Sequence, residues 1–159
     1  MSTLVANSPV VQQAMAIEDR QQLTELLHPA FLVLKNDFSV RQFQLHTPPA
    51  TSMLRLHKLK KFGDDLSSFR QTVIEANQQK KRIRGIEKGV AGLGIRGISP
   101  ISLGSQHLGT VEFGMSLGQA FIDQFKQQNG VDIAIHTRND GAFVTFASSF
   151  EKDSFFNNS

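Results

Sequence analysis

The stretch that decides the fold begins FQLHTPPATSMLRLH at residues 43–57 and continues FGDDLSSFR at residues 62–70. It ends with GLGIRGI at residues 92–98 and GTVEFG at residues 109–114. Apolar and polar residues alternate on both sides of Pro48-Pro49, which is typical of β-strands whose two faces differ. Because neither proline can donate to a β-ladder, the pair ends the first strand. The stretch therefore predicts two strands, then a helix, then further strands.

Outside this stretch, the spacing of apolar residues predicts helices and strands along the rest of the chain. Helices are expected at about 9–28, from Asp64-Asp65 through Ala76, and at 117–128. Strands are expected at 41–47, 52–57, 83–87, 93–102, 107–116, 131–136 and 142–146. Pro29 is expected to end the first helix, Asn129-Gly130 the last, and Asn139-Asp140-Gly141 is expected to form a hairpin turn. The polar tail from Glu151 is expected to fray.

This order of elements predicts an α+β fold with an antiparallel sheet of about five to six strands and helices packed around it. The chain has 159 residues, of which 40% are hydrophobic, so one domain over residues 1–159 is expected. We expect a long N-terminal helix at about 9–28 and a core at about 29–147.

Composition excludes several classes of site. The absence of cysteine excludes disulfides, thiolate zinc sites and cysteine nucleophiles. The net charge of +3 comes mainly from Lys58–Lys61 and Lys80–Arg84. The chain has 17 Lys and Arg residues and 14 Asp and Glu residues, and this small excess of positive charge is not typical of a dedicated nucleic-acid-binding protein. No run of eighteen apolar residues is present, and the start lacks the order of a signal peptide.

The separated motifs resemble the Cache sensor domain, a PAS-like module found outside the membrane in bacterial methyl-accepting chemotaxis receptors and sensor kinases. The resemblance runs from Asp19-Arg20 to about Phe121. It implies the periplasmic domain of an inner-membrane chemotaxis receptor, whose transmembrane helices would flank this segment. It also implies binding of a small organic acid or similar metabolite without catalysis, cofactor or metal. A histidine kinase sensor is the alternative.

Polar side chains on the first two strands form the candidate ligand site. Gln44 and His46 share one face of the first strand, and Met53, Arg55 and His57 share one face of the second. A guanidinium beside imidazoles suits a carboxylate, because its planar fork matches two oxygens. The alternative is that Arg55 pairs with Asp64, Asp65 or Glu87.

Two further residues on neighbouring strands, Glu87 and Arg96, complete the predicted site as an ion pair or a pocket wall. The Asp64-Asp65 pair is expected to cap the following helix.

Rival functions and the assembly rest on weaker patterns. His46 and His57 could bind a metal ion together with an Asp or Glu carboxylate, as in a small metal-dependent enzyme. The glycines at 92–97 do not form a dinucleotide fingerprint, because the sequence continues as strand. A homodimer is expected through the N-terminal helix, whose narrow apolar stripe includes Val11 and Met15.

Overall fold

We describe residues 1–89 and 92–150 in a computed structural model. The chain divides into two compact units, Met1–Ser116 and Leu117 onward. The expectation of one domain over 1–159 stays a prediction. Among the described residues, no helix is long and apolar enough to cross a membrane.

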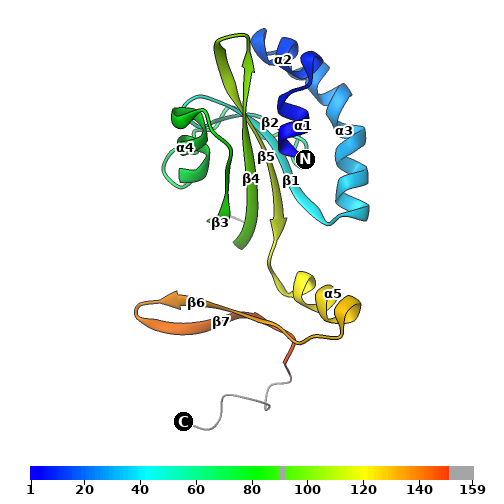
Figure 1. The fold of residues 1–159 in the computed structure, drawn as a ribbon, viewed down its shortest axis with the longest axis vertical. Helices are drawn as coiled ribbons and strands as arrows, with labels where there is room; N and C mark the ends of the chain where they lie inside the picture. The colour runs from blue at the N-terminus through cyan, green and yellow to red at the C-terminus, as the bar shows by residue number, and fades with distance from the viewer. Residues whose placement is uncertain (90–91, 151–159) are drawn as a thin grey trace. The chain divides into compact units, whose positions relative to one another are not determined.

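The first unit is built on a five-stranded antiparallel sheet, which confirms the predicted fold class (Figure 1). The strands are β1 (Val40–Thr47), β2 (Thr51–Arg55), β3 (Ile83–Gly89), β4 (Gly92–Leu103) and β5 (Gln106–Ser116), in the order β2-β1-β5-β4-β3. β5 pairs along most of its length with β1 on one side and β4 on the other. Every second side chain of a strand therefore lies on the same face of the sheet. Pro48-Pro49 separates β1 from β2, as the sequence predicts.

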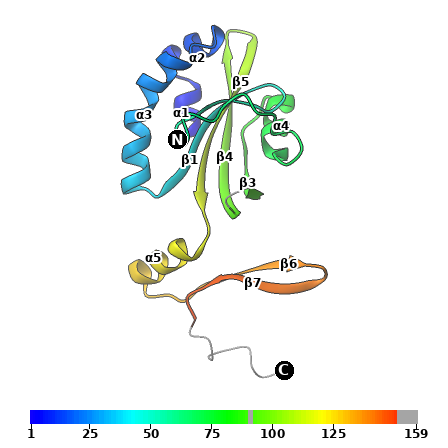
Figure 2. The same ribbon diagram turned by 180° about the vertical axis from the view of Figure 1, so that it is seen from behind.

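Helices cover both faces of this sheet (Figures 1 and 2). On one side lie α1 (Ser2–Ala6), α2 (Pro9–Ala16) and α3 (Arg20–Asp37), and on the other lies α4 (Gln71–Gln79). The main core packs Leu23, Leu27 and Phe31 of α3 against apolar residues of β1 and β5. A smaller core under α4 contains Val73, Ala76 and Ile98. The polar residues that alternate with the apolar ones on β1 and β5 therefore face α4.

The predicted N-terminal helix at 9–28 is interrupted, which corrects the sequence interpretation. It breaks at Ile17–Asp19, where Glu18 takes a φ of 53° and Asp19 caps α3 by accepting a hydrogen bond from the Gln22 amide. Pro29 does not end the helix but lies within α3. One lost backbone hydrogen bond is outweighed by the burial of the α3 apolar face against the sheet.

The apolar stripe expected to form a dimer contact is buried within the same chain. Val11 is 1% exposed and Met15 is 2% exposed, and both belong to the main core. An amphipathic helix next to a sheet buries its apolar face there first. These two residues are therefore unavailable to a second subunit.

The helix α4 begins six residues later than Asp65, so the predicted cap is wrong. Leu66–Arg70 forms turns, and the Asp65 carboxylate accepts a hydrogen bond from the Ser67 amide at 2.9 Å. Asp64 instead pairs with Arg55. Local propensity could not separate a turn that buries Leu66 from the first turn of a helix, because both bury the same residue.

The second unit contains α5 (Gln119–Asn129) and a hairpin of β6 (Ala134–Asn139) and β7 (Ala142–Ser148). Gly130 ends α5 with a φ of 65°, as predicted. Asp140 and Gly141 both have positive φ, which suits the tight turn predicted there. Phe143 is 76% exposed on this two-stranded sheet. The predicted tail from Glu151 lies outside the described residues.

Candidate ligand-binding groove

A row of polar side chains crosses the sheet face under α4. Gln44 lies opposite Glu112 and His46 opposite Thr110 in the β1–β5 pair. All four side chains are almost completely buried. The alternation of the strands explains the row, because their apolar neighbours point into the core on the other face.

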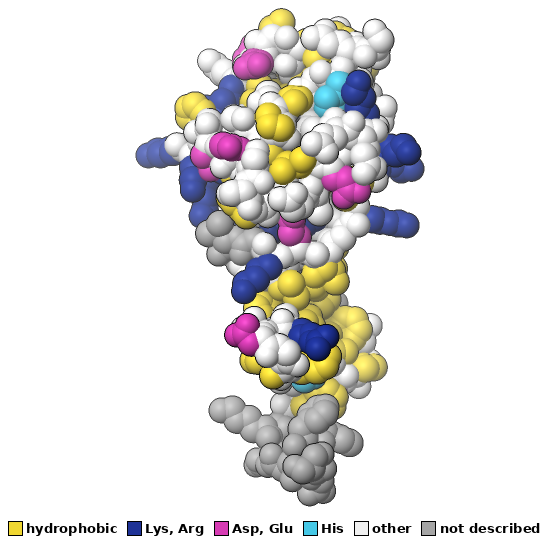
Figure 3. Space-filling model, turned by 90° about the vertical axis from the view of Figure 1, so that its left-hand side faces the viewer, with side chains coloured by type: hydrophobic (Ala, Val, Ile, Leu, Met, Phe, Trp, Pro, Cys, Tyr) yellow, Lys and Arg dark blue, Asp and Glu magenta, His cyan; other side chains and the backbone are white. Residues whose placement is uncertain are grey.

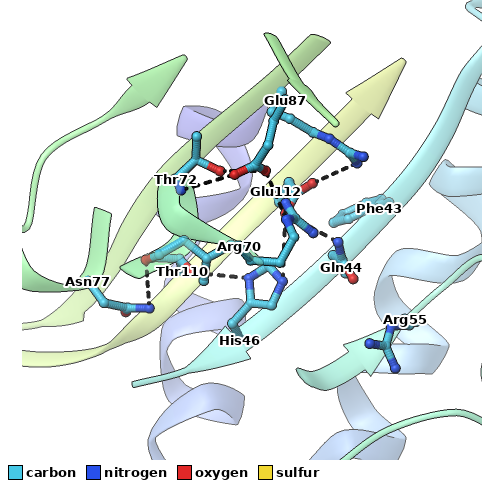
Figure 4. A network of polar contacts seen from close by, with 12 residues as sticks. Phe43, Gln44, His46, Arg55, Arg70, Thr72, Asn77, Glu87, Thr110 and Glu112 are labelled. Carbon is cyan, nitrogen blue, oxygen red and sulfur yellow. Dashed lines mark hydrogen bonds and ion pairs between the residues drawn. The ribbon is translucent and has the colours of Figure 1, made fainter. Parts of the chain in front are cut away.

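The centre of the row is the Glu112 carboxylate, which is inaccessible to solvent (Figure 4). Arg70 lies 2.5 Å from one oxygen, Arg96 lies 3.0 Å from the other, and the Gln44 amide donates at 3.2 Å. Burial acts to raise the pKa of Glu112, but the guanidiniums of Arg70 and Arg96 outweigh it and hold the pKa below its ordinary value. The carboxylate is therefore ionised at neutral pH.

Arg70 links this centre to a second carboxylate and to α4. Its Nε lies 2.9 Å from Glu87 of β3. Thr72 donates to Glu87 through its amide at 3.3 Å and its hydroxyl at 2.9 Å. Two guanidiniums, of Arg70 and Arg96, thus face two carboxylates, so the buried network is balanced in charge.

His46 is fully buried beside Glu112 and is neutral at pH 7. Its Nδ1 lies 3.1 Å from the Thr110 hydroxyl, and its Nε2 lies 3.7 Å from the Glu112 carboxylate without a hydrogen-bond partner. Burial lowers the pKa of His46 to about 4, although Glu112 acts in the opposite direction. The ring therefore belongs to the structural network below the groove.

Arg55 lies apart from this network (Figure 4). It binds a different carboxylate, that of Asp64. Its two terminal nitrogens contact the two oxygens of Asp64 at 2.5 and 2.8 Å, and it donates to the Lys61 carbonyl at 3.1 Å. The hydrogen bond from Arg55 lowers the pKa of Asp64. The sequence left this pairing open as the alternative to ligand contact.

His57 lies just beyond the end of β2. Its Nδ1 is 3.4 Å from the Phe43 carbonyl oxygen, and burial is the main cause that lowers its pKa. Its ring lines the groove beside Arg55. Met53 does not, since a bulge in the β1–β2 pair breaks the alternation and Met53 is buried in the main core.

A groove of about 450 Å³ runs over these residues in the first unit. Of the predicted site residues, it is lined by Gln44, Arg55, His57 and Arg96, whereas His46, Met53 and Glu87 are not among its lining residues. Its Lys and Arg residues are Lys35, Arg41, Arg55, Lys58, Lys61, Arg70 and Arg96, against one acidic lining residue, Asp64. Figure 3 shows basic side chains spread around this unit on the face drawn.

A smaller hollow of about 250 Å³ adjoins the groove and shares Arg41, Gln42 and Arg96 with it. Arg96 lies across the backbone of β5 at Gly114, where a Cβ would come 2.6 Å from its guanidinium nitrogen. The glycine is therefore needed so that Arg96 can reach Glu112. Within the described residues, no group of three or more His, Asp or Glu side chains could hold a metal ion.

Sequence reasoning missed Arg70 and Glu112, the two residues that organise the site. The importance of Glu112 could have been predicted, because an acidic residue among the apolar residues of a central strand needs a buried partner. The role of Arg70 could not have been predicted, since Arg70 lies in a turn and is 42 residues from Glu112 in the sequence. Only the fold brings the two together.

Comparison with solved structures shows the same fold at low sequence identity. The sensor domain of DcuS from E. coli has a TM-score of 0.60 at 14% identity, with 82% of this chain and 90% of that one covered. The extracellular domain of the putative histidine kinase vpHK1S-Z8 has a TM-score of 0.53 at 18% identity, covering 77% and 51%.

A domain of a putative sensory box/GGDEF family protein from Vibrio parahaemolyticus has a TM-score of 0.53 at 16% identity, covering 76% and 52%. The chain thus spans about half the length of the last two proteins.

None of the curated proteins matches this sequence. One family profile, dCache_3, matches residues 1–158 and is described as a double sensory domain of two-component sensor kinase. The match covers nearly the whole chain. The chain therefore belongs to this family of sensory domains.

Proposed function

We propose that the first unit binds a small anionic metabolite, such as an organic acid, in the groove. The observation that carries this proposal is the charge of the lining. The guanidiniums of Arg70 and Arg96 are balanced by Glu112 and Glu87, and Arg55 is balanced by Asp64. The remaining basic lining residues have no ion pair with a described residue: Lys35, Arg41, Lys58 and Lys61. This excess of positive charge favours an anion and raises its rate of association.

In this proposal the domain is the periplasmic sensor of an inner-membrane receptor and works by binding alone. A ligand in the groove contacts α3 as well as the β2–α4 loop, because both line it, and so changes the packing of α3 against the sheet. The change biases the signalling state by as much as the ligand's affinity differs between the two states. The receptor's output domain is a chemotaxis signalling region or a histidine kinase, and the family description favours the kinase.

A homodimer through the N-terminal helices remains part of the proposal, at a different face. Leu26, Pro29, Ala30 and Val33 are exposed at helical spacing on α3. Replacement of Leu26 and Val33 by Glu should shift sedimentation toward monomer without a change in melting temperature. A chain that sediments as a monomer before substitution would contradict the dimer.

The test of ligand class is a thermal-shift screen of the wild-type chain with short carboxylates, amino acids, phosphate, sulfate and neutral sugars. A ligand at one hundred times its dissociation constant should stabilise the fold by about 2.7 kcal/mol. Replacing Lys58 and Lys61 by Gln should weaken an anionic hit, whereas the same change at Lys80 and Lys81, outside the groove, should not. Stabilisation by neutral compounds alone would refute the proposed class.

A further inference from the structure

The Arg55–Asp64 pair occupies the groove in the way that an external carboxylate would. Both terminal nitrogens of Arg55 are used, one on each oxygen of Asp64, at 2.5 and 2.8 Å. This parallel arrangement is the strongest mode in which a guanidinium binds a carboxylate. Both residues line the groove. A ligand carboxylate that used the same guanidinium would therefore have to take the place of Asp64.

The two partners differ in how firmly each is held. The Arg55 side chain is 8% exposed, and it also donates to the Lys61 carbonyl. The Asp64 side chain is 36% exposed. An exposed partner exchanges its ion pair for water at small cost, whereas a buried guanidinium left without a carboxylate is costly. Arg55 is therefore the fixed member of the pair, and Asp64 is the one that can be replaced.

The backbone allows this replacement without unfolding of the β2–α4 loop. The Asp64 carbonyl accepts from the Ser52 amide at 3.0 Å, and the Gly63 amide donates to the Ser52 carbonyl at 2.7 Å. These bonds hold the chain beside β2 whatever the Asp64 side chain does. A rotation of that side chain toward solvent is sufficient to free Arg55.

A third arginine fixes the middle of the same loop. Arg20, at the start of α3, donates to the carbonyls of Leu59 and Met53. Its guanidinium also lies 3.6 Å from the ring centroid of Phe62. The loop thus keeps its position on α3 while Asp64 turns away, and the basic residues Lys58 and Lys61 stay at the groove.

We propose that Asp64 is an internal competitor for the anion site at Arg55, so that it sets both the affinity and the class of the ligand. The inference rests on the proposed function, that the groove binds a small anion. Only an anion with two coplanar oxygens regains both hydrogen bonds that Asp64 gives up. Carboxylates are therefore favoured over chloride, which offers one acceptor atom.

The experiment is a titration of the full chain with sodium acetate, followed through the Arg55 Nε–H signal by NMR, with sodium chloride at equal ionic strength as the reference. Acetate should shift this signal in the wild type. Asp64→Asn should lower the dissociation constant for acetate on the order of fivefold, because the competing carboxylate is gone. Asp64→Ala provides a second variant that lacks the amide.

Asp65→Asn is the matched control, because it removes the same charge one residue away and Asp65 pairs with Ser67 rather than Arg55. An equal gain in both Asn variants would show a general charge effect and overturn the proposal. A weaker affinity in Asp64→Asn would make Asp64 part of the site and also overturn it. If the wild type binds acetate and Asp64→Asn leaves the affinity unchanged, the proposal that Asp64 competes with the ligand is wrong, whereas the proposed function stands. If no variant binds any anion, the proposed function fails as well.

Discussion

Two sets of arginine–carboxylate pairs lie along the same groove, and they differ in burial. Glu112 is inaccessible to solvent and is shared by Arg70 and Arg96, whereas Asp64 is partly exposed and belongs to Arg55 alone. Removal of one partner from a buried set leaves an uncompensated charge in a medium of low polarity. When Asp64 separates from Arg55, by contrast, its carboxylate is exposed enough for water to solvate it. The first set therefore holds the sheet and α4 together, and the second is the one in which we propose that a ligand replaces the carboxylate.

The largest effect is expected from Glu112→Gln. Arg70 and Arg96 would both lose a carboxylate while they remain buried, so the free energy of unfolding should fall by about 3–5 kcal/mol. Urea denaturation measures the change. Asp65→Asn, which removes an exposed carboxylate, is the control and should be nearly neutral. If Glu112→Gln has the same midpoint of urea unfolding as the wild type, the buried network does not stabilise the fold. The contrast between this network and the Arg55–Asp64 pair is then wrong.

The next effect is on the pH dependence of stability. The pKa of His46 is about 4 in the folded chain and about 6.5 in the unfolded chain. As the pH falls from 6.5 to 4, the unfolded chain binds the proton first, so stability should decline by about 3 kcal/mol from this group. Above pH 6.5 the effect is absent, and below pH 4 it levels off.

The pKa values of His57 and His107 are also lowered and act in the same direction, so His46 is isolated by difference. His46→Gln should flatten the stability curve between pH 4 and 6.5 relative to the wild type. His28→Gln, at a half-exposed position, is the matched control. An unchanged slope in His46→Gln would show that folding does not lower the pKa of His46.

A smaller effect is expected from Gly114→Ala, which disturbs the buried set without removing a charge. The new Cβ would lie 2.6 Å from the Arg96 guanidinium and 3.2 Å from Gln42. Displacing Arg96 should cost about 1–3 kcal/mol, measured by thermal and urea unfolding. Gly85→Ala on β3 is the control, since its Cβ would meet nothing within 4 Å. Equal melting temperatures for the two variants would mean that Arg96 can move without loss.

The smallest effect is expected from Asp64→Asn, which tests the exposed pair. The new amide oxygen can still accept a hydrogen bond from the buried Arg55, and the site is partly solvated, so the free energy of unfolding should fall by about 1 kcal/mol. Differential scanning calorimetry against Asp65→Asn gives the comparison. A loss as large as that of Glu112→Gln would place Arg55–Asp64 among the structural pairs and would argue against its exchange with a ligand.

The sequence alone was enough to predict most of the strands, the α+β class and the hairpin turn at Asp140-Gly141. These features depend on local rules, namely alternation with period two and the need for positive φ in tight turns. The sequence also placed Gln44, Arg55 and His57 on adjoining strands, and these three line one groove with Arg96, whereas their contact with a ligand stays a prediction. The break at Glu18 and the continuation of α3 through Pro29 could not be predicted, since tertiary packing there outweighs local preference.

Only the tertiary structure decided which charges meet. Arg70 and Glu112 are 42 residues apart, and their contact depends on the turn before α4 folding onto β5. Arg55 had three possible acidic partners in the sequence, and the path of the β2–α4 loop selects Asp64. Alternation along a strand determines which face a side chain occupies, but it says nothing about what arrives at that face from another element. The division into a buried, fixed network and a partly exposed pair is therefore a property of the fold.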